Sequence, residues 1–111
     1  MAMYLTKGRH TPEGWARLLA NPEDRRTALS PVVEAMGGKL HGYWYAFGDA
    51  DVFVLFEAPD DVTVASLLVK VASTGAFASV STTKLLTVEE ALDAIGRGAG
   101  TEYRAPGAPG S

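Results

Sequence analysis

Two histidines, His10 and His41, are the side chains of this sequence whose ordinary pKa lies closest to neutral pH. A general base that works at pH 7 would most simply be one of them. The simpler interpretation is two ordinary histidines, one in a loop and one on an edge strand. His41 and His10 are therefore the candidate catalytic residues, and their surroundings decide between the two interpretations.

Aromatic side chains with polar tips follow His41 along the chain. Tyr43 and Tyr45 share one face of an expected strand with His41, whereas Trp44 points to the other face, because side chains alternate along a strand. With Trp15 from the first expected helix, the two tyrosines suit a pocket for an aromatic or polycyclic ligand. Packing in a core or a dimer explains the same residues equally well.

Charged residues near the expected turns have two interpretations. Arg9, with Lys7 near it, could hold an anionic ligand at the start of the first helix, where free backbone amides help. Surface charge is the commoner explanation. Asp49 and Asp51 flank an expected hairpin turn, and turns select aspartate because its carboxylate bonds to nearby backbone. We therefore interpret these two aspartates as turn residues and not as acid catalysts.

A metal site in this chain would draw on His10, His41 and Glu57. If the first strand runs parallel to the third and antiparallel to the second, these three residues lie near one end of the sheet. With strands about 4.8 Å apart, ligation would still need favourable rotamers and a matching register. We therefore expect no metal. The sequence also has no phosphate loop or dinucleotide fingerprint, so we expect no cofactor.

The composition limits the class of protein. The chain has 111 residues, a formal charge of −3, an apolar fraction of 47% and no cysteine. Interspersed charges of both signs make nucleic acid an unlikely partner, and no run reaches the roughly 18 apolar residues of a membrane span. The first nine residues are too short and too polar for a signal peptide. We therefore expect a cytoplasmic protein with no membrane partner.

The elements follow from periodicity and from start and stop signals. We expect strands over 3–7, 39–47, 51–58 and 77–86, and helices over 12–20, 22–36, 62–74 and 88–95. This order predicts an α+β fold, a ferredoxin-like βαββαβ unit with an extra C-terminal helix and an antiparallel four-stranded sheet. Residues 1–97 form the expected domain, and the glycine, proline and alanine content of 98–111 predicts a flexible tail.

The run from Val52 to Phe56 shows no alternation of apolar and polar residues. Both faces of this strand must therefore be shielded from water, although helices would cover only one face of the sheet. Two copies packed through their sheets would bury the other face. We expect a homodimer, or a higher oligomer built from it.

The hairpin and its flanks carry three short motifs, Gly37-Gly38-Lys39-Leu40, Gly48-Asp49-Ala50-Asp51 and Glu57-Ala58-Pro59-Asp60. In these motifs the chain resembles the GYD family of small bacterial proteins, with Ala50 where the family usually has tyrosine. The resemblance spans about residues 3–95 and implies a dimeric α/β barrel of the ferredoxin-like superfamily. Related folds include cofactor-free oxygenases, isomerases, polyketide cyclases, haem-dependent dismutases and amino-acid-sensing modules, so the resemblance names no activity.

Two main functional hypotheses remain. The first is a homodimer that binds a small apolar or aromatic molecule between sheet and helices. The second is a cofactor-free oxygenase, isomerase or cyclase acting on a small aromatic or polyketide-like substrate, with His41 or His10 as base. A structural role in a larger assembly is a third. A deep pocket containing a histidine with a shifted pKa would favour the enzyme.

Overall fold

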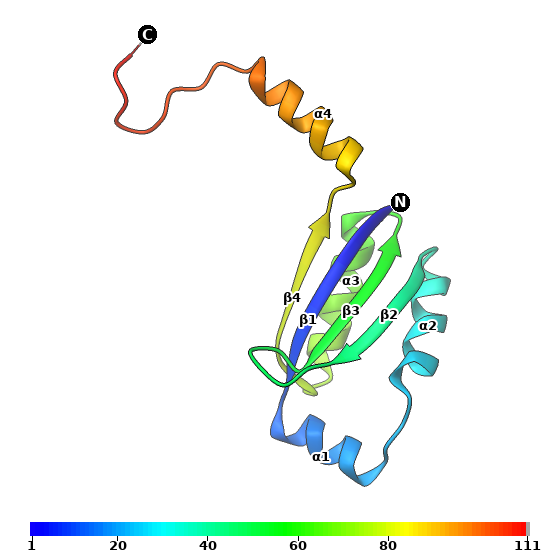
Figure 1. The fold of residues 1–111 in the computed structure, drawn as a ribbon. Helices are drawn as coiled ribbons and strands as arrows, with labels where there is room; N and C mark the ends of the chain where they lie inside the picture. The colour runs from blue at the N-terminus through cyan, green and yellow to red at the C-terminus, as the bar shows by residue number, and fades with distance from the viewer. Residues whose placement is uncertain (111) are drawn as a thin grey trace.

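A computed structural model, which describes residues 1–110, contains one sheet with helices packed on one side (Figure 1). The elements follow in the order β1 (Ala2–His10), α1 (Pro12–Ala20), α2 (Arg25–Ala35), β2 (Lys39–Tyr45), β3 (Val52–Ala58), α3 (Asp61–Ser73), β4 (Phe77–Leu85) and α4 (Val88–Ala99). The predicted ferredoxin-like order with an extra C-terminal helix is therefore confirmed.

The sheet has the strand order β2-β3-β1-β4, and every neighbouring pair is antiparallel. The expectation that the first strand runs parallel to the third is wrong. β1 and β2 run the same way because a helical crossover joins them, and the hairpin then reverses β3. As a result Ala2 pairs with Ala58 at one end of the sheet, and Gly8 pairs with Val52 at the other.

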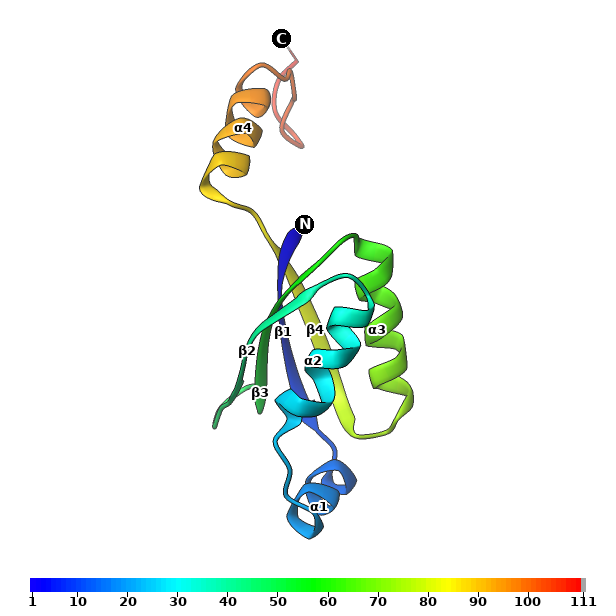
Figure 2. The same cartoon turned by 90° about the vertical axis from the view of Figure 1, so that its right-hand side faces the viewer.

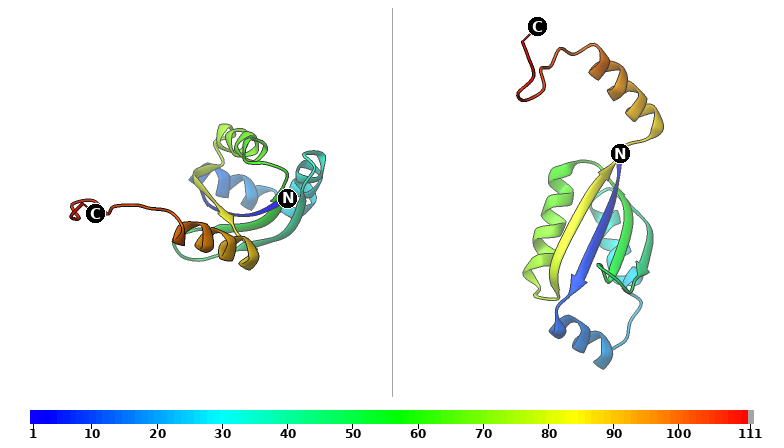
Figure 3. Two further views of the ribbon diagram at one scale, coloured as in Figure 1. Left: turned by 90° about the horizontal axis from the view of Figure 1, so that it is seen from above. Right: turned by 60° about the vertical axis from the view of Figure 1, so that its left-hand side comes forward.

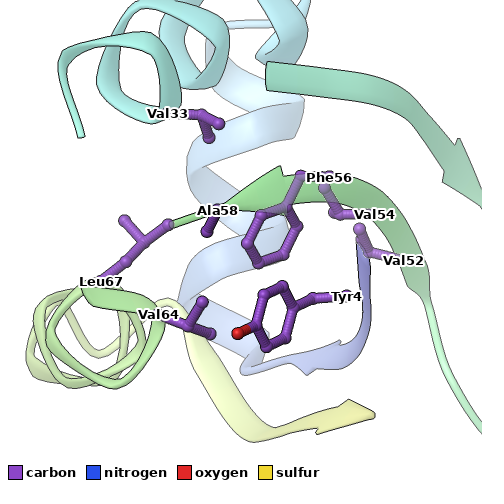
Figure 4. Packing of buried hydrophobic residues seen from close by; sticks show 8 residues of the cluster. All are labelled: Tyr4, Val33, Val52, Val54, Phe56, Ala58, Val64 and Leu67. Atoms are coloured by element: carbon purple, nitrogen blue, oxygen red, sulfur yellow. The ribbon is translucent and has the colours of Figure 1, made fainter. Parts of the chain in front are cut away.

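The helices α2 and α3 cover one face of the sheet, as the side view in Figure 2 shows. β3 alternates between buried residues on this helix-covered face and half-buried residues on the other. Its buried set is Val52, Val54, Phe56 and Ala58. Tyr4 of β1 stacks on Phe56 with ring centroids 5.6 Å apart, against Val64 and Leu67 of α3 and Val33 of α2 (Figure 4).

The opposite face of the sheet is covered by no element of the described chain, and we call it the open face (Figure 2). The strand register assigns its residues, since partners across the ladder share a face. The apolar ones are Met3, Leu5, Trp44, Phe53, Leu55 and Leu85. The apolar run from Val52 to Phe56 in β3 therefore has one face covered by helices and one face that nothing covers in the single chain.

Local signals set the helix starts. Thr11 caps α1 with Pro12 in the first turn, and Thr87 and Glu90 form a capping box at the start of α4. α2 begins later than the predicted residue 22, because Asp24 accepts the amide of Arg26 and caps the helix. Gly96 does not end the last helix, which continues to Ala99 into the predicted tail. Ser111, the last residue of that tail, lies outside the described residues.

Candidate functional site

A cavity of about 690 Å³ lies between the helix-covered face of the sheet and the three helices α1, α2 and α3. Its walls are mainly apolar, and they include Leu29, Val33, Val52, Val54, Phe56, Leu67, Leu68, Val71, Phe77 and Val80. This volume falls within the range of pockets that hold drug-sized ligands. The aliphatic side chains of the sheet and of the three helices therefore do not fill the space between them.

His10, at the end of β1, lines the cavity, and its side chain is only 4% exposed. The ring lies between two aromatic side chains, with centroids 4.4 Å from Trp15 and 4.6 Å from Phe77. Its Nδ1 is buried without a hydrogen-bond partner among the described residues, and lies 3.9 Å from Asp51 Oδ2. The same carboxylate oxygen accepts the backbone amide of His10 at 2.8 Å.

The pKa of His10 is lowered, first because burial disfavours the imidazolium and also because Arg25 adds positive charge nearby. Asp51 acts in the opposite direction but does not cancel the effect of burial. At pH 7 the ring is therefore neutral, the form of histidine that can accept a proton. Asp51, which lies beside Nδ1, would stabilise the ring after the ring had accepted a proton.

Other polar groups line the same cavity. Arg25 donates to Glu23 at 2.7 Å, and both residues lie in the cavity wall. Burial, with a smaller effect of Tyr45, raises the pKa of Tyr43 to about 12. That phenol stays protonated at neutral pH and remains a hydrogen-bond donor. Thr6 also lines the cavity, and its hydroxyl is paired with that of Thr82 at 2.7 Å.

The predicted ligand-binding residues divide between this cavity and other places. Tyr43 lines the cavity directly. Trp15 packs against His10 with the two rings tilted, and Tyr45 packs beside Tyr43 with ring centroids 5.5 Å apart, so both form a second layer of aromatic rings. Arg9 lies elsewhere: it donates to the carbonyl oxygens of Gly48 and Asp49 at 3.2 and 2.9 Å and braces the hairpin.

His41 is separated from this group by a β-bulge. The register of β2 against β3 shifts between Leu40 and Gly42, which inserts an extra residue at His41. The ring consequently lies near Glu57 on the open face, with Nε2 and Oε2 3.6 Å apart. The expectation that His41 shares a face with Tyr43 and Tyr45 is wrong, because simple alternation does not hold through a bulge.

The expected grouping of His10, His41 and Glu57 at one end of the sheet is also wrong. His10 follows the end where Gly8 pairs with Val52, whereas Glu57 pairs with Lys39 and Met3 at the opposite end. Within residues 1–110 no three histidine, aspartate or glutamate side chains are arranged to hold a metal ion. No helix in this range has the length and apolar character needed to cross a bilayer.

Sequence reasoning did not identify several polar residues of the cavity wall. They are Arg17 of α1, Asn21 and Glu23 of the connection to α2, and Arg25 at the start of α2, and no local motif marks them. One available signal is that this connection is polar and follows the helix carrying Trp15. Asp51, expected as a turn residue, also accepts the backbone amide of His10 and so links the hairpin to β1.

The arrangement is suited to one kind of chemistry. An apolar chamber, a neutral histidine backed by a carboxylate, and a protonated phenol could bind an apolar molecule and move a proton on it. On the open face, His41 lies beside Glu57, with Nε2 and Oε2 3.6 Å apart.

Comparison with known proteins supports the fold. The sequence model of the GYD domain family matches residues 4–95 of this chain. No curated protein matches the chain. A solved structure, the hypothetical protein PHS023 from Pyrococcus horikoshii, is similar with a TM-score of 0.50 and 11% identity, over 78% of this chain and 92% of that one.

A second solved structure, FFRP-DM1, is similar with a TM-score of 0.49 and 15% identity, over 78% of this chain and 100% of that one. At these identities, the match to the Pyrococcus protein bears on the fold alone.

Proposed function

Because this chain belongs to the GYD domain family, whose name states no activity, we propose that it is a homodimer that binds a small apolar or aromatic molecule in the cavity. The observation that supports this most directly is the cavity of about 690 Å³, lined mainly by apolar residues with a few polar groups among them. Burying an apolar ligand there gains about 25 cal/mol per Å² of surface removed from water.

The dimer is supported by the open face. Leu5, Phe53 and Leu55 lie on strands at its centre, and Trp44 beside them is 52% exposed. Packing two such faces together would remove this apolar surface from water and leave both cavities, on the far side of each sheet, unobstructed. We propose a cytoplasmic location, since a cysteine-free fold needs no oxidising compartment. Nucleic acid and membrane are not among the proposed partners.

Native mass spectrometry of the purified protein tests for a bound molecule directly. A quantitative test uses the aromatic probe 1-anilinonaphthalene-8-sulfonate and a matched pair of variants on α3. Leu68 lines the cavity, whereas its neighbour Val69 does not line it and is 70% exposed. Leu68→Trp should weaken probe binding at least tenfold, and Val69→Trp less than threefold. Equal affinities for the two variants would contradict the cavity as binding site.

A second function, proton-transfer catalysis without a cofactor, is favoured by one observation. The cavity contains a histidine, His10, whose pKa is shifted so that it is neutral at pH 7, next to Asp51. As general base, neutral His10 would take a proton from an acidic carbon of the bound molecule and return it at another position. This step is common to isomerases and cyclases and precedes oxygen addition in cofactor-free oxygenases.

The two histidines provide the test of this second function. His10→Asn should leave the affinity for a molecule recovered by native mass spectrometry within about tenfold and reduce its turnover by at least 100-fold. His41→Asn, on the open face beside Glu57, should change neither quantity. Unchanged turnover in His10→Asn would rule out the catalytic role and leave the binding role standing.

A further inference from the structure

α4 carries an apolar stripe that is buried nowhere in the described chain. Val88, Leu92 and Ile95 recur at helical spacing on one side of it and are between 62% and 72% exposed, and no α4 residue is buried. Its other side is charged, with Asp93 and Arg97 paired at 2.9 Å. A surface helix of this pattern normally packs its stripe against something.

The position of α4 shows where that partner would have to be. α4 follows β4 beyond the end of the sheet and is displaced to the side away from α2 and α3, as Figure 2 and the left view of Figure 3 both show. The radius of gyration is 18.3 Å, compared with about 13 Å for a globular domain of this length. α4 therefore lies beyond the end of the sheet, on the side from which a second copy would approach the open face.

A second unburied apolar side chain lies at the opposite end of the sheet. Phe47, in the turn between β2 and β3, is fully exposed, with a relative accessibility of 104%. α4 leaves the sheet where Met3 pairs with Leu85, while Phe47 follows the end where Tyr45 pairs with Val52. A seven-residue strand is about 23 Å long, so α4 and Phe47 cannot meet within one chain.

The area of the open face supports a contribution from α4. Four strands spaced about 4.8 Å apart and about 25 Å long offer roughly 500 Å². A stable interface buries about 800 Å² on each partner. A twelve-residue helix is about 18 Å long and about 10 Å wide, so α4 adds nearly 200 Å² and covers as much on the partner. With both contributions the interface reaches the usual size.

We propose that α4 of each copy packs its apolar stripe against the Phe47 turn of the partner subunit, clasping two sheets stacked through their open faces with antiparallel strands. This rests on the homodimer proposed above. A two-fold axis perpendicular to the strands brings the α4 end of each copy next to the Phe47 end of the other. The dimer therefore contains this contact twice. Both exposed apolar features are then covered by one symmetric arrangement.

Engineered cysteines test this contact on the full chain, which has no cysteine of its own. The double variant Leu92→Cys/Phe47→Cys should form a covalent dimer on mild oxidation, because a disulfide needs Cβ atoms about 4 Å apart. Leu92→Cys alone, and Leu92→Cys/Val69→Cys with its second cysteine on α3, should form several times less. Equal cross-linking in all three variants, or none in the double variant, would overturn the proposed contact.

Sedimentation separates this proposal from the dimer on which it rests. Leu92→Glu should raise the dimer dissociation constant at least tenfold, whereas Ala94→Glu, off the stripe on the same helix, should change it less than threefold. A wild-type monomer would overturn both proposals. If Leu92→Glu does not weaken the dimer, the proposed contact between α4 and the Phe47 turn is wrong, and pairing through the sheets is unaffected.

Discussion

The burial of His10 in the cavity wall predicts a specific pH dependence of stability. Its pKa is lowered below the ordinary 6.5 by burial and by Arg25, with Asp51 acting in the opposite direction. Between the folded value and 6.5 the unfolded chain holds a proton that the folded chain lacks. The free energy of unfolding therefore falls as the pH drops through that window, by at most about 1.4 kcal/mol per pH unit.

His10→Phe isolates this effect, because a phenyl ring can keep the contacts with Trp15 and Phe77 without titrating. Urea unfolding at pH 7.5 and pH 5.5 should show a larger loss of stability for the wild type than for His10→Phe. Carboxylates elsewhere titrate in both proteins and cancel in the comparison. Equal losses would mean that His10 is not the neutral group described above.

At the scale of elements, two glycines in and before β2 should respond differently to the same change. A Cβ on Gly38 would lie 2.1 Å from the carbonyl oxygen of Glu57, which is fixed backbone in β3. A Cβ on Gly42 would lie 2.3 Å from the far end of the Trp44 ring. That ring is half exposed and can rotate away.

Gly38→Ala should therefore lower the free energy of unfolding by about 1–3 kcal/mol, as overpacking against backbone does. Gly42→Ala should change it by less than about 1 kcal/mol, and the altered position of Trp44 should shift the tryptophan fluorescence. Urea titrations followed by circular dichroism measure both variants. A larger loss for Gly42→Ala than for Gly38→Ala would contradict the geometry at these two positions.

Element order was predictable from the sequence because periodicity and capping residues are local signals. Thr11, Asp60 and Thr87 each cap the helix that their sequence context indicates. The bulge at His41 was not predictable, since nothing in Gly42 or its neighbours distinguishes a regular strand from one with an inserted residue. One such insertion moved a candidate catalytic histidine to the other face of the sheet.

For the whole molecule, the sequence indicated that β3 needs cover on two sides, but it could not show a cavity. A cavity depends on how far three helices stand from a sheet, and that distance is set by packing between residues far apart in the chain. The polar wall residues Arg17, Glu23 and Arg25 come together with His10 and Tyr43 only once α2 packs on the sheet and α1 packs beyond its end. Tyr43 and Trp15 could be predicted as pocket residues from their type alone, since large aromatic side chains with polar tips are common around ligand cavities.

The dimer proposal predicts that stability depends on protein concentration. When the folded state is a dimer and the unfolded state is a monomer, mass action raises the melting temperature as the protein is concentrated. The melting temperature of the wild type should therefore be several degrees higher at 100 µM than at 1 µM. A shift of about this size is what a small domain shows when its free energy of unfolding changes by about 1 kcal/mol. Leu55→Lys, which puts a charge at the centre of the open face, should remove this dependence.

The same variant separates the two faces of the sheet. Leu55 pairs with Leu5 on the open face, whereas the cavity lies under the helices on the other side. Leu55→Lys should therefore sediment as a monomer and still bind 1-anilinonaphthalene-8-sulfonate with an affinity within threefold of the wild type. If probe binding disappears together with the dimer, the ligand site needs both copies, because loss of a distant interface would not otherwise empty a cavity lined by one chain.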